Sequence, residues 1–430
     1  MNRGPVAPAK VPTKGPPWTL AVAAVICGAL MSAKVVIVGE LFVGEPILIL
    51  VASLTVLFRG VGRRLRPGFF WMIAAAGLVM LLGYVVADVA AATGPGQYLR
   101  GWARTVVFGL DALALMILVS HHERLLWWFA LGLGTGLLGN MALDGAAISV
   151  TTWKTGYGIA FGILVALASA YASSGVAASL LAAFGVATLL LDYRGLGAVF
   201  LLGAAVIAIR PGSNARRRHA SLHWLLALLG VVTAVVIVVA LLEQSDHDYH
   251  RRRIESNTGR YAGILVAAQA IADSPLLGYG SWAADKRYVQ MLRREFDKAS
   301  AGQDIHGDVG DSMLPHSQLL QAWVEGGLAG GAFFVLLAVH LGGGLRWLIA
   351  GHRYGRQTAI YTLFVLGGLW NLLFSPFLGQ HRIFVACAIA TLSLLAWEKA
   401  ATRSRQATRR PPPAPSGIEL LESTLKHPAR

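Results

Sequence analysis

The chain has 430 residues, of which 55% are hydrophobic and only 14% charged. This composition excludes a soluble globular protein and is typical of a polytopic membrane protein. The formal net charge of +15 does not indicate nucleic-acid binding, because the basic residues form short runs between apolar segments, as in chains oriented across a bilayer. The two cysteines, Cys27 and Cys387, lie inside apolar segments and are interpreted as packing residues.

Apolar segments of about 20 residues, long enough to cross a bilayer, recur along the chain. We predict an all-α fold of about twelve transmembrane helices, with about nine in 18–242 and about three in 318–398. A basic tail (1–17) precedes them, a long polar loop (243–317) separates the two groups, and a disordered tail (399–430) follows. The predicted spans are 18–38, 41–58, 69–91, 102–120, 125–143, 157–172, 175–191, 195–210, 222–242, 318–341, 358–375 and 382–398.

The distribution of basic residues predicts the orientation of these helices. Arginine-rich connections at 59–66, 210–219 and 346–356 alternate with connections that contain few basic residues. Because basic connections stay in the cytoplasm, we predict that both termini are cytoplasmic and that the long loop lies outside the membrane.

The long loop contains two predicted helices. Residues 260–272 carry apolar side chains at helical spacing and predict an amphipathic helix, and residues 286–298 predict a strongly charged one. The segment S-D-H-D-Y-H at 245–250 contains metal-binding residue types, but three arginines follow it directly. We therefore predict no metal site and no cofactor.

Two arginines, Arg194 and Arg260, are candidate phosphate ligands. Arg194 lies at the outer end of a predicted span, where it either anchors the helix at the interface, paired with Asp192, or presents its guanidinium to a phosphate. Arg260 begins the amphipathic helix, where a positive charge opposes the helix dipole unless an anion binds there. The alternative for Arg260 is a solvated side chain in a basic region.

His316 directly precedes the tenth predicted span, in the motif P-H-S-Q-L-L-Q-A-W-V-E-G-G. An imidazole there can take a proton from a hydroxyl group, although an interfacial histidine without a catalytic role fits the same position. Glu325 lies nine residues further on, inside the apolar segment, where a carboxylate usually faces a cavity or a charged partner.

Weaker candidates lie near the same predicted face of the membrane. They could line a cavity, touch phosphate or sugar, or pair between helices. These candidates are Arg104, Asp111, Lys154, His381 and Arg382.

The order and spacing of these motifs resemble a known family. An arginine-glycine pair at the start of a span is followed by R-Y-A-G-I-L-V-A-A-Q-A-I, then P-L-L-G-Y-G, then H-S-Q-L-L-Q-A-W-V-E-G-G-L-A-G. This order is similar to that of the O-antigen ligase superfamily, which includes Wzy-type polymerases and some protein O-oligosaccharyltransferases. The resemblance covers residues 192–344.

The resemblance implies a metal-independent glycosyltransferase of the bacterial inner membrane, with its active site facing the periplasm. The donor would be a glycan on undecaprenyl diphosphate, bound by Arg194 and Arg260, and His316 would deprotonate the acceptor. Lipid A-core as acceptor would make the protein an O-antigen ligase in lipopolysaccharide biosynthesis, whereas a second lipid-linked glycan would make it a polymerase. A transporter or flippase of lipid-linked sugars and a non-catalytic assembly protein are the alternatives of other classes.

Overall fold

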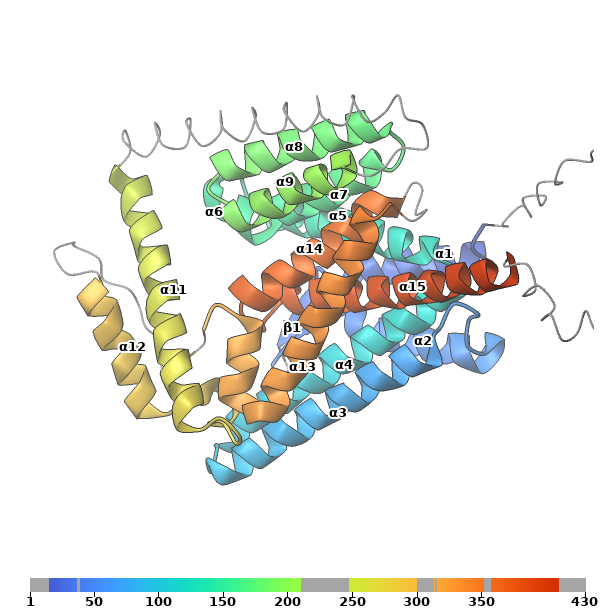
Figure 1. Cartoon of the computed structure of the whole chain (residues 1–430). Coiled ribbons are helices and arrows are strands. Elements are labelled where there is room, and N and C mark those ends of the chain that lie inside the picture. Colours follow the sequence, from blue (N-terminus) through green and yellow to red (C-terminus); the bar gives the residue numbers. More distant parts are fainter. Residues whose placement is uncertain are drawn as a thin grey trace, which may run out of the picture.

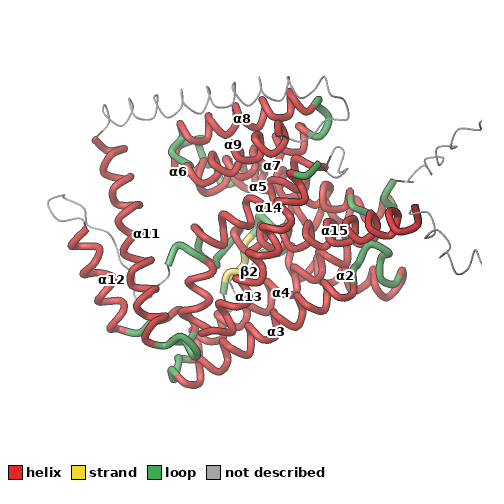
Figure 2. The backbone as a smooth tube through the Cα atoms, viewed as in Figure 1, coloured by secondary structure: helices red, strands yellow, loops and turns green. Residues whose placement is uncertain are grey.

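The computed structural model describes residues 15–36, 39–209, 247–299, 313, 315–351 and 357–409. Within these residues almost every element is a helix (Figure 1; Figure 2). Five of the described helices are long and apolar enough to cross a bilayer, so the chain is a multi-pass membrane protein. These five are α3 (Pro67–Ala90), α4 (Pro95–His121), α5 (Arg124–Leu143), α13 (Gln318–Ile349) and α15 (Gln380–Arg409).

Shorter helices occupy most of the other predicted spans. They are α1 (Trp18–Leu30), α2 (Gly44–Arg59), α7 (Gly158–Ser169), α8 (Ser174–Leu190), α9 (Arg194–Ile209) and α14 (Thr358–Phe374). The predicted span at 222–242 lies outside the described residues, so a total of about twelve stays a prediction.

The first predicted span, 18–38, is wrong at its C-terminal end. Helix α1 stops at Leu30, and the chain then forms a short antiparallel hairpin of β1 (Lys34–Val36) and β2 (Glu40–Phe42). The β-branched residues of β1 favour an extended backbone, and the charged Lys34 pairs with Glu40 across the hairpin at 3.3 Å. An apolar run was therefore mistaken for the continuation of a helix.

Two other boundaries differ from the prediction. The span predicted at 157–172 begins earlier, because α6 (Val150–Thr152) and a π-helical turn, η1 (Trp153–Tyr157), lead into α7. Helix α15 continues to Arg409, so the beginning of the tail predicted to be disordered is helical. Good helix formers fill this extension, and no proline interrupts it.

The loop between the two groups of spans contributes two helices at one end of the bundle. Helix α11 (His247–Asp273) includes the predicted amphipathic helix but starts earlier, and α12 (Lys286–Ala299) agrees with the predicted charged helix. Figure 1 shows both on the left, whereas the end of α15 lies on the right, at the opposite end of the bundle. Along the chain, a short 3₁₀ turn, η2 (Ser281–Ala283), lies between α11 and α12.

Helix α13 is not continuous, and its break receives part of this loop. Gly327 has φ +61° and interrupts the helix. The loop backbone pairs with the opened turn: the amides of Tyr279 and Gly280 donate to the carbonyls of Val324 and Glu325 at 2.8 and 3.0 Å. A Cβ at Gly327 would lie 2.1 Å from a loop carbonyl oxygen. The G-Y-G and E-G-G motifs are therefore the two halves of one backbone contact.

Helices α1 and α5 approach each other through glycines. A Cβ at Gly132 would lie 2.0 Å from the carbonyl oxygen of Val25, and one at Gly136 would lie 2.3 Å from that of Ala29. Small residues at such crossings allow the backbones to pack closely in a membrane.

This crossing gives a test of the helix packing. We expect Gly132→Ala to lower the thermal unfolding temperature of the detergent-solubilised protein, because overpacking typically costs about 1–3 kcal/mol. Gly139→Ala on the same helix is the control: nothing lies within 4 Å of its added Cβ, and alanine is the better helix former. Equal effects of the two substitutions would contradict the close contact.

Candidate active site

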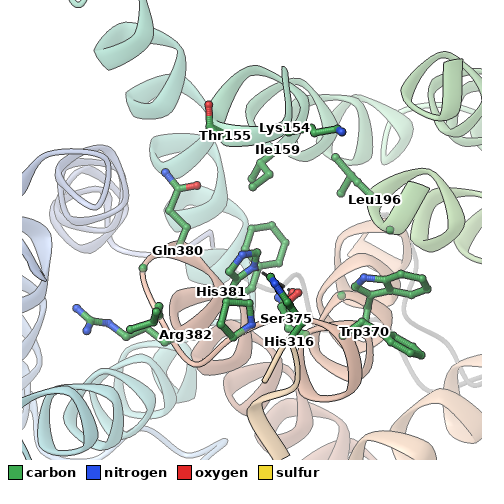
Figure 3. Close-up of a pocket in the computed structure, with 18 of the residues that line it drawn as sticks. Lys154, Thr155, Ile159, Leu196, His316, Trp370, Ser375, Gln380, His381 and Arg382 are labelled. Atoms are coloured by element: carbon green, nitrogen blue, oxygen red, sulfur yellow. Dashed lines mark hydrogen bonds between the residues drawn. The ribbon is translucent and has the colours of Figure 1, made fainter. Parts of the chain in front are cut away.

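A cavity of about 1050 Å³ lies where the hairpin, α4, α7, α9, α11, α14 and α15 come together. Among the residues that the structure describes, seven lysine or arginine side chains line it, against two carboxylates. These charged residues are Lys34, Arg100, Arg104, Lys154, Arg194, Arg260 and Arg382, with Glu40 and Asp192. His316 and His381 also line the cavity, and Figure 3 shows Lys154 and Thr155 across open space from these two histidines. A surplus of positive charge in a partly enclosed cavity favours an anionic ligand.

Asp192 holds two of the cations in place. Its buried carboxylate accepts hydrogen bonds from Lys154 Nζ at 2.5 Å and from Arg194 Nε at 3.3 Å. Asp192 itself has φ +56°, a left-handed conformation that aspartate tolerates better than most residues. Lys154 comes from the π-helical turn η1, and such turns are frequent at functional sites. The carboxylate therefore arranges an ammonium and a guanidinium side by side on the cavity wall.

Arg194 begins α9 and bonds Asp192 through Nε, and neither of its terminal NH₂ groups bonds another of the described residues. The pairing with Asp192 expected from the sequence is present, and it is compatible with phosphate binding at the outer edge of the guanidinium, which stays a prediction.

Arg260 reaches the same cavity from α11 and has no ion-pair partner within the described ranges. Its pKa is lowered, first by burial and then by the charge of Arg194, while Asp192 acts in the opposite direction. An arginine remains protonated despite such a shift. The guanidinium groups of Arg194 and Arg260 are close enough to repel each other. The one carboxylate nearby, Asp192, also pairs with Lys154. The positive charge here is therefore not balanced, which favours a multiply charged anion.

His316 lies between α11 and α14. The next residue, Ser317, caps α13 by accepting from the Leu320 amide at 3.3 Å, and its hydroxyl donates to the Leu372 carbonyl at 2.9 Å. These bonds fix the backbone beside His316, whose imidazole is exposed to the cavity. Its pKa is lowered, first because the surrounding protein removes part of its solvation inside the cavity and then by the charge of Arg260. The imidazole is therefore neutral at pH 7 and able to accept a proton.

His381 lies close enough to His316 for their charges to interact. Its Nδ1 is 3.2 Å from the Asn371 side-chain oxygen, which orients the ring. Arg382, the next residue, points away from both histidines in Figure 3. Its guanidinium is buried against Glu45, with Nε 3.0 Å from Oε1, and also donates to the Glu40 carbonyl. Arg382 thus ties the hairpin to α15, although it lies at the cavity wall.

Glu325 lies behind the cavity and does not line it. The carboxylate is fully buried and accepts from the Tyr84 hydroxyl at 2.7 Å and from the Trp282 amide and Gln321 Nε2, each at 3.1 Å. It also forms an ion pair with Arg104. Arg104 does line the cavity, so this pair joins the loop, α4 and α13 directly beneath it.

Asp111 is also buried away from the cavity lining. Neither of its carboxylate oxygens has a hydrogen-bond partner among the described atoms.

The structure thus brings Arg194, Arg260 and His316 to one cavity together with Lys154 and His381. Sequence reasoning did not assign site positions to several further lining residues: Lys34, Arg100, Asp192, Trp282 and Asn371. Asp192 had a signal, since it lies two residues before Arg194. Trp282 had none, because its position depends on the loop backbone.

Comparison with known protein families finds a match in this region. Residues 158–335 match the family model described as O-antigen ligase, and this range contains Arg194, Arg260 and His316. No protein of curated function matches the chain. The family consists of membrane enzymes that transfer glycans.

The buried Arg104–Glu325 pair generates a stability prediction. Glu325→Gln should lower the thermal unfolding temperature strongly, by the equivalent of about 3–5 kcal/mol, because it leaves the Arg104 charge buried without a partner. The double variant with Arg104→Met should recover part of this loss. Glu123→Gln, which removes a half-exposed pair with Arg64 at 3.8 Å, is the control and should have little effect. A double variant no more stable than Glu325→Gln would contradict the charge-pairing explanation.

Proposed function

We propose that this multi-pass membrane protein, whose residues 158–335 match the O-antigen ligase family model, transfers a glycan from undecaprenyl diphosphate to an acceptor hydroxyl. The observation that supports this most directly is that Arg194, Arg260 and His316 line one cavity. We assign the end of the bundle that bears α11 and α12 to the periplasm of a bacterial inner membrane, with both termini in the cytoplasm, in line with the distribution of basic loops.

The donor's diphosphate occupies the cationic part of the cavity. Arg194 and Arg260 bind its oxygens through guanidinium N–H groups, and Lys154 adds an ammonium beside them. Negative charge grows on the diphosphate as the sugar leaves, so preorganised cations stabilise the transition state more than the bound donor. Charge neutralisation by these side chains is why the proposed reaction is metal-independent.

The lipid chain of the donor occupies the apolar part of the same cavity. Leu196 and Val199 of α9, with Leu363 and Trp370 of α14, form a wall that continues inward from Arg194. The hydrocarbon of an isoprenoid chain would pack against these side chains, as apolar ligands do in apolar pockets.

His316 acts as the general base. It removes the proton of the acceptor hydroxyl, whose oxygen then forms a bond to the anomeric carbon of the donor sugar. The bond between that carbon and the diphosphate oxygen breaks, and its electron pair leaves with undecaprenyl diphosphate. A positioned base typically contributes about 10²–10⁴ to the rate. We favour lipid A-core as the acceptor, which makes the protein an O-antigen ligase; a lipid-linked acceptor would make it a polymerase.

The first test uses membrane vesicles with a labelled undecaprenyl-diphosphate oligosaccharide, with and without lipid A-core. The wild type should transfer the oligosaccharide to lipid A-core, and His316→Ala should lower the rate by about 10²-fold or more. The control is His340→Ala: this histidine of α13 packs against Phe69, outside the cavity lining.

Three other results would change the proposal. Growth of the lipid-linked chain without lipid A-core would identify a polymerase. An unchanged rate in His316→Ala would remove this residue as the base. Movement of the labelled lipid across the membrane without glycan transfer would favour a transporter.

The pH profile tests the state of the base. A base works only when unprotonated, and the pKa of His316 lies below its ordinary value of about 6.5. The rate should therefore be constant near pH 7 and fall on the acid side with a midpoint below pH 6.5, measured as kcat/KM. Arg260→Gln removes a positive charge that lowers this pKa, so its midpoint should move to higher pH.

The matched control for the pH experiment is Arg287→Gln. Arg287 lies on α12, is largely exposed and pairs with Asp273 at 3.0 Å. Its substitution should leave the midpoint in place. A midpoint that is the same in the wild type and in Arg260→Gln would show that the titrating group is not His316 beside Arg260.

A further inference from the structure

We infer that Trp282 is a platform on which a sugar ring of the donor or the acceptor glycan stacks. This inference rests on the proposed function and adds a binding site for the carbohydrate itself.

The backbone at Trp282 is in an unfavourable conformation. Trp282 has φ +69° and Ala283 has φ +42°, directly after Gly280 at φ +76°. Bulky side chains rarely adopt the left-handed region, and glycine would serve there without strain. Such conformations persist where the surrounding structure enforces them, and they concentrate at functional sites. The presence of a tryptophan at a position that suits glycine therefore points to a role for its side chain.

Hydrogen bonds from the bundle enforce this conformation. The carboxylate of Asp88 accepts from the Ser281 amide at 2.6 Å and from the Ser281 hydroxyl at 2.8 Å. The Trp282 amide donates to Glu325 at 3.1 Å. Ser281, Asp88 and Glu325 are all buried, so water does not compete for these bonds. The turn is thus fixed to α3 and α13, and it presents the following side chain in one direction.

The indole itself is held at the cavity wall. Its Nε1 donates to the Gln97 carbonyl at 3.2 Å, and the Arg104 guanidinium carbon lies 5.1 Å from the ring centroid. The side chain is half-buried and lines the same cavity as Arg194, Arg260 and His316. Its one polar group already has a partner, so what it offers to a ligand is a flat apolar surface.

The surroundings of this surface fit a sugar better than a lipid chain or a phosphate. A pyranose has a face of C–H groups that packs on an aromatic ring and a rim of hydroxyls that need hydrogen-bond partners. Arg100 of α4, an exposed cation that lines the same cavity, can donate to these hydroxyls. Arg104 places its charge against the ring itself, while its Nε and Nη1 are enclosed by protein. An isoprenoid chain offers Arg100 no acceptor, whereas sugar hydroxyls accept from it.

The test compares two lipids that differ only in the glycan. Binding of an undecaprenyl-diphosphate oligosaccharide and of undecaprenyl diphosphate alone is measured for the detergent-solubilised full chain. Trp282→Gly removes the ring and relieves the strain, so the variant should fold; Trp282→Phe keeps an aromatic surface. Trp323→Phe is the control, since this tryptophan donates to the Pro275 carbonyl at 3.0 Å and does not line the cavity.

If the donor glycan stacks on Trp282, Trp282→Gly should weaken binding of the oligosaccharide lipid about tenfold, or about 1.4 kcal/mol, and leave undecaprenyl diphosphate binding unchanged. Trp282→Phe should retain most of the affinity. If the acceptor stacks there, donor binding should stay unchanged and the KM for the acceptor should rise about tenfold. Equal weakening of both lipids, or no change in donor binding and acceptor KM, would overturn the platform.

Failure of the proposed function would look different in the same experiment. A wild-type protein that binds neither lipid, or that binds both but transfers no glycan to any acceptor, would contradict glycan transfer itself. The effect of Trp282→Gly therefore tests the platform only if the wild type binds the lipids and transfers the glycan.

Discussion

The buried carboxylate of Glu325 is the interaction on which the site depends. It lies two residues before the break in α13 and holds Tyr84 of α3, Arg104 of α4 and the Trp282 amide of the loop at one point. The same break pairs the loop backbone at Tyr279 and Gly280 with α13. A charged group in this position costs desolvation unless several donors satisfy it, and here they come from the consecutive helices α3 and α4 and from the loop much later in the chain. The loop is therefore fixed to the bundle where the cavity begins.

Five of the seven cations that line the cavity fall into two groups with different consequences. Arg104 and Arg382 are buried in ion pairs with Glu325 and Glu45, and these pairs join elements of the fold. Lys154 and Arg194 are both bonded to the carboxylate of Asp192, whereas Arg260 feels its charge without being bonded to it. The second group thus keeps a positive field at the cavity wall, which makes the site complementary to a diphosphate.

The sequence predicts the membrane class, the approximate positions of most described helices and the loop that carries α11 and α12. Apolar length and basic connections determine these features locally. Boundaries failed where two structures suit the same residues: the β-branched run after Leu30 forms a hairpin strand, and the residues after Glu398 continue a helix. The break in α13 also escaped prediction, because the glycines at 326 and 327 are explained equally well by helix packing.

In the candidate site, too, local sequence patterns predict some residues, whereas others depend on tertiary contacts. Arg194, Arg260 and His316 were singled out from motifs, and they line one cavity. Asp192 and Trp282 belong to the site because of their three-dimensional positions. The carboxylate of Asp192 faces two cations, and Trp282 lies in a turn that Asp88 of a distant helix holds. Contacts between residues so far apart in sequence follow from the tertiary fold and have no local pattern. Sequence reasoning therefore found the charged ligands and missed the groups that arrange them.

The most direct test of the account is an experimental structure of the His316→Ala variant with an undecaprenyl-diphosphate oligosaccharide bound. This variant should bind the donor and turn it over slowly. The account predicts the diphosphate within hydrogen-bond distance of Arg194 and Arg260, with the anomeric carbon facing position 316. A diphosphate bound elsewhere, with these two arginines free of it, would contradict the account.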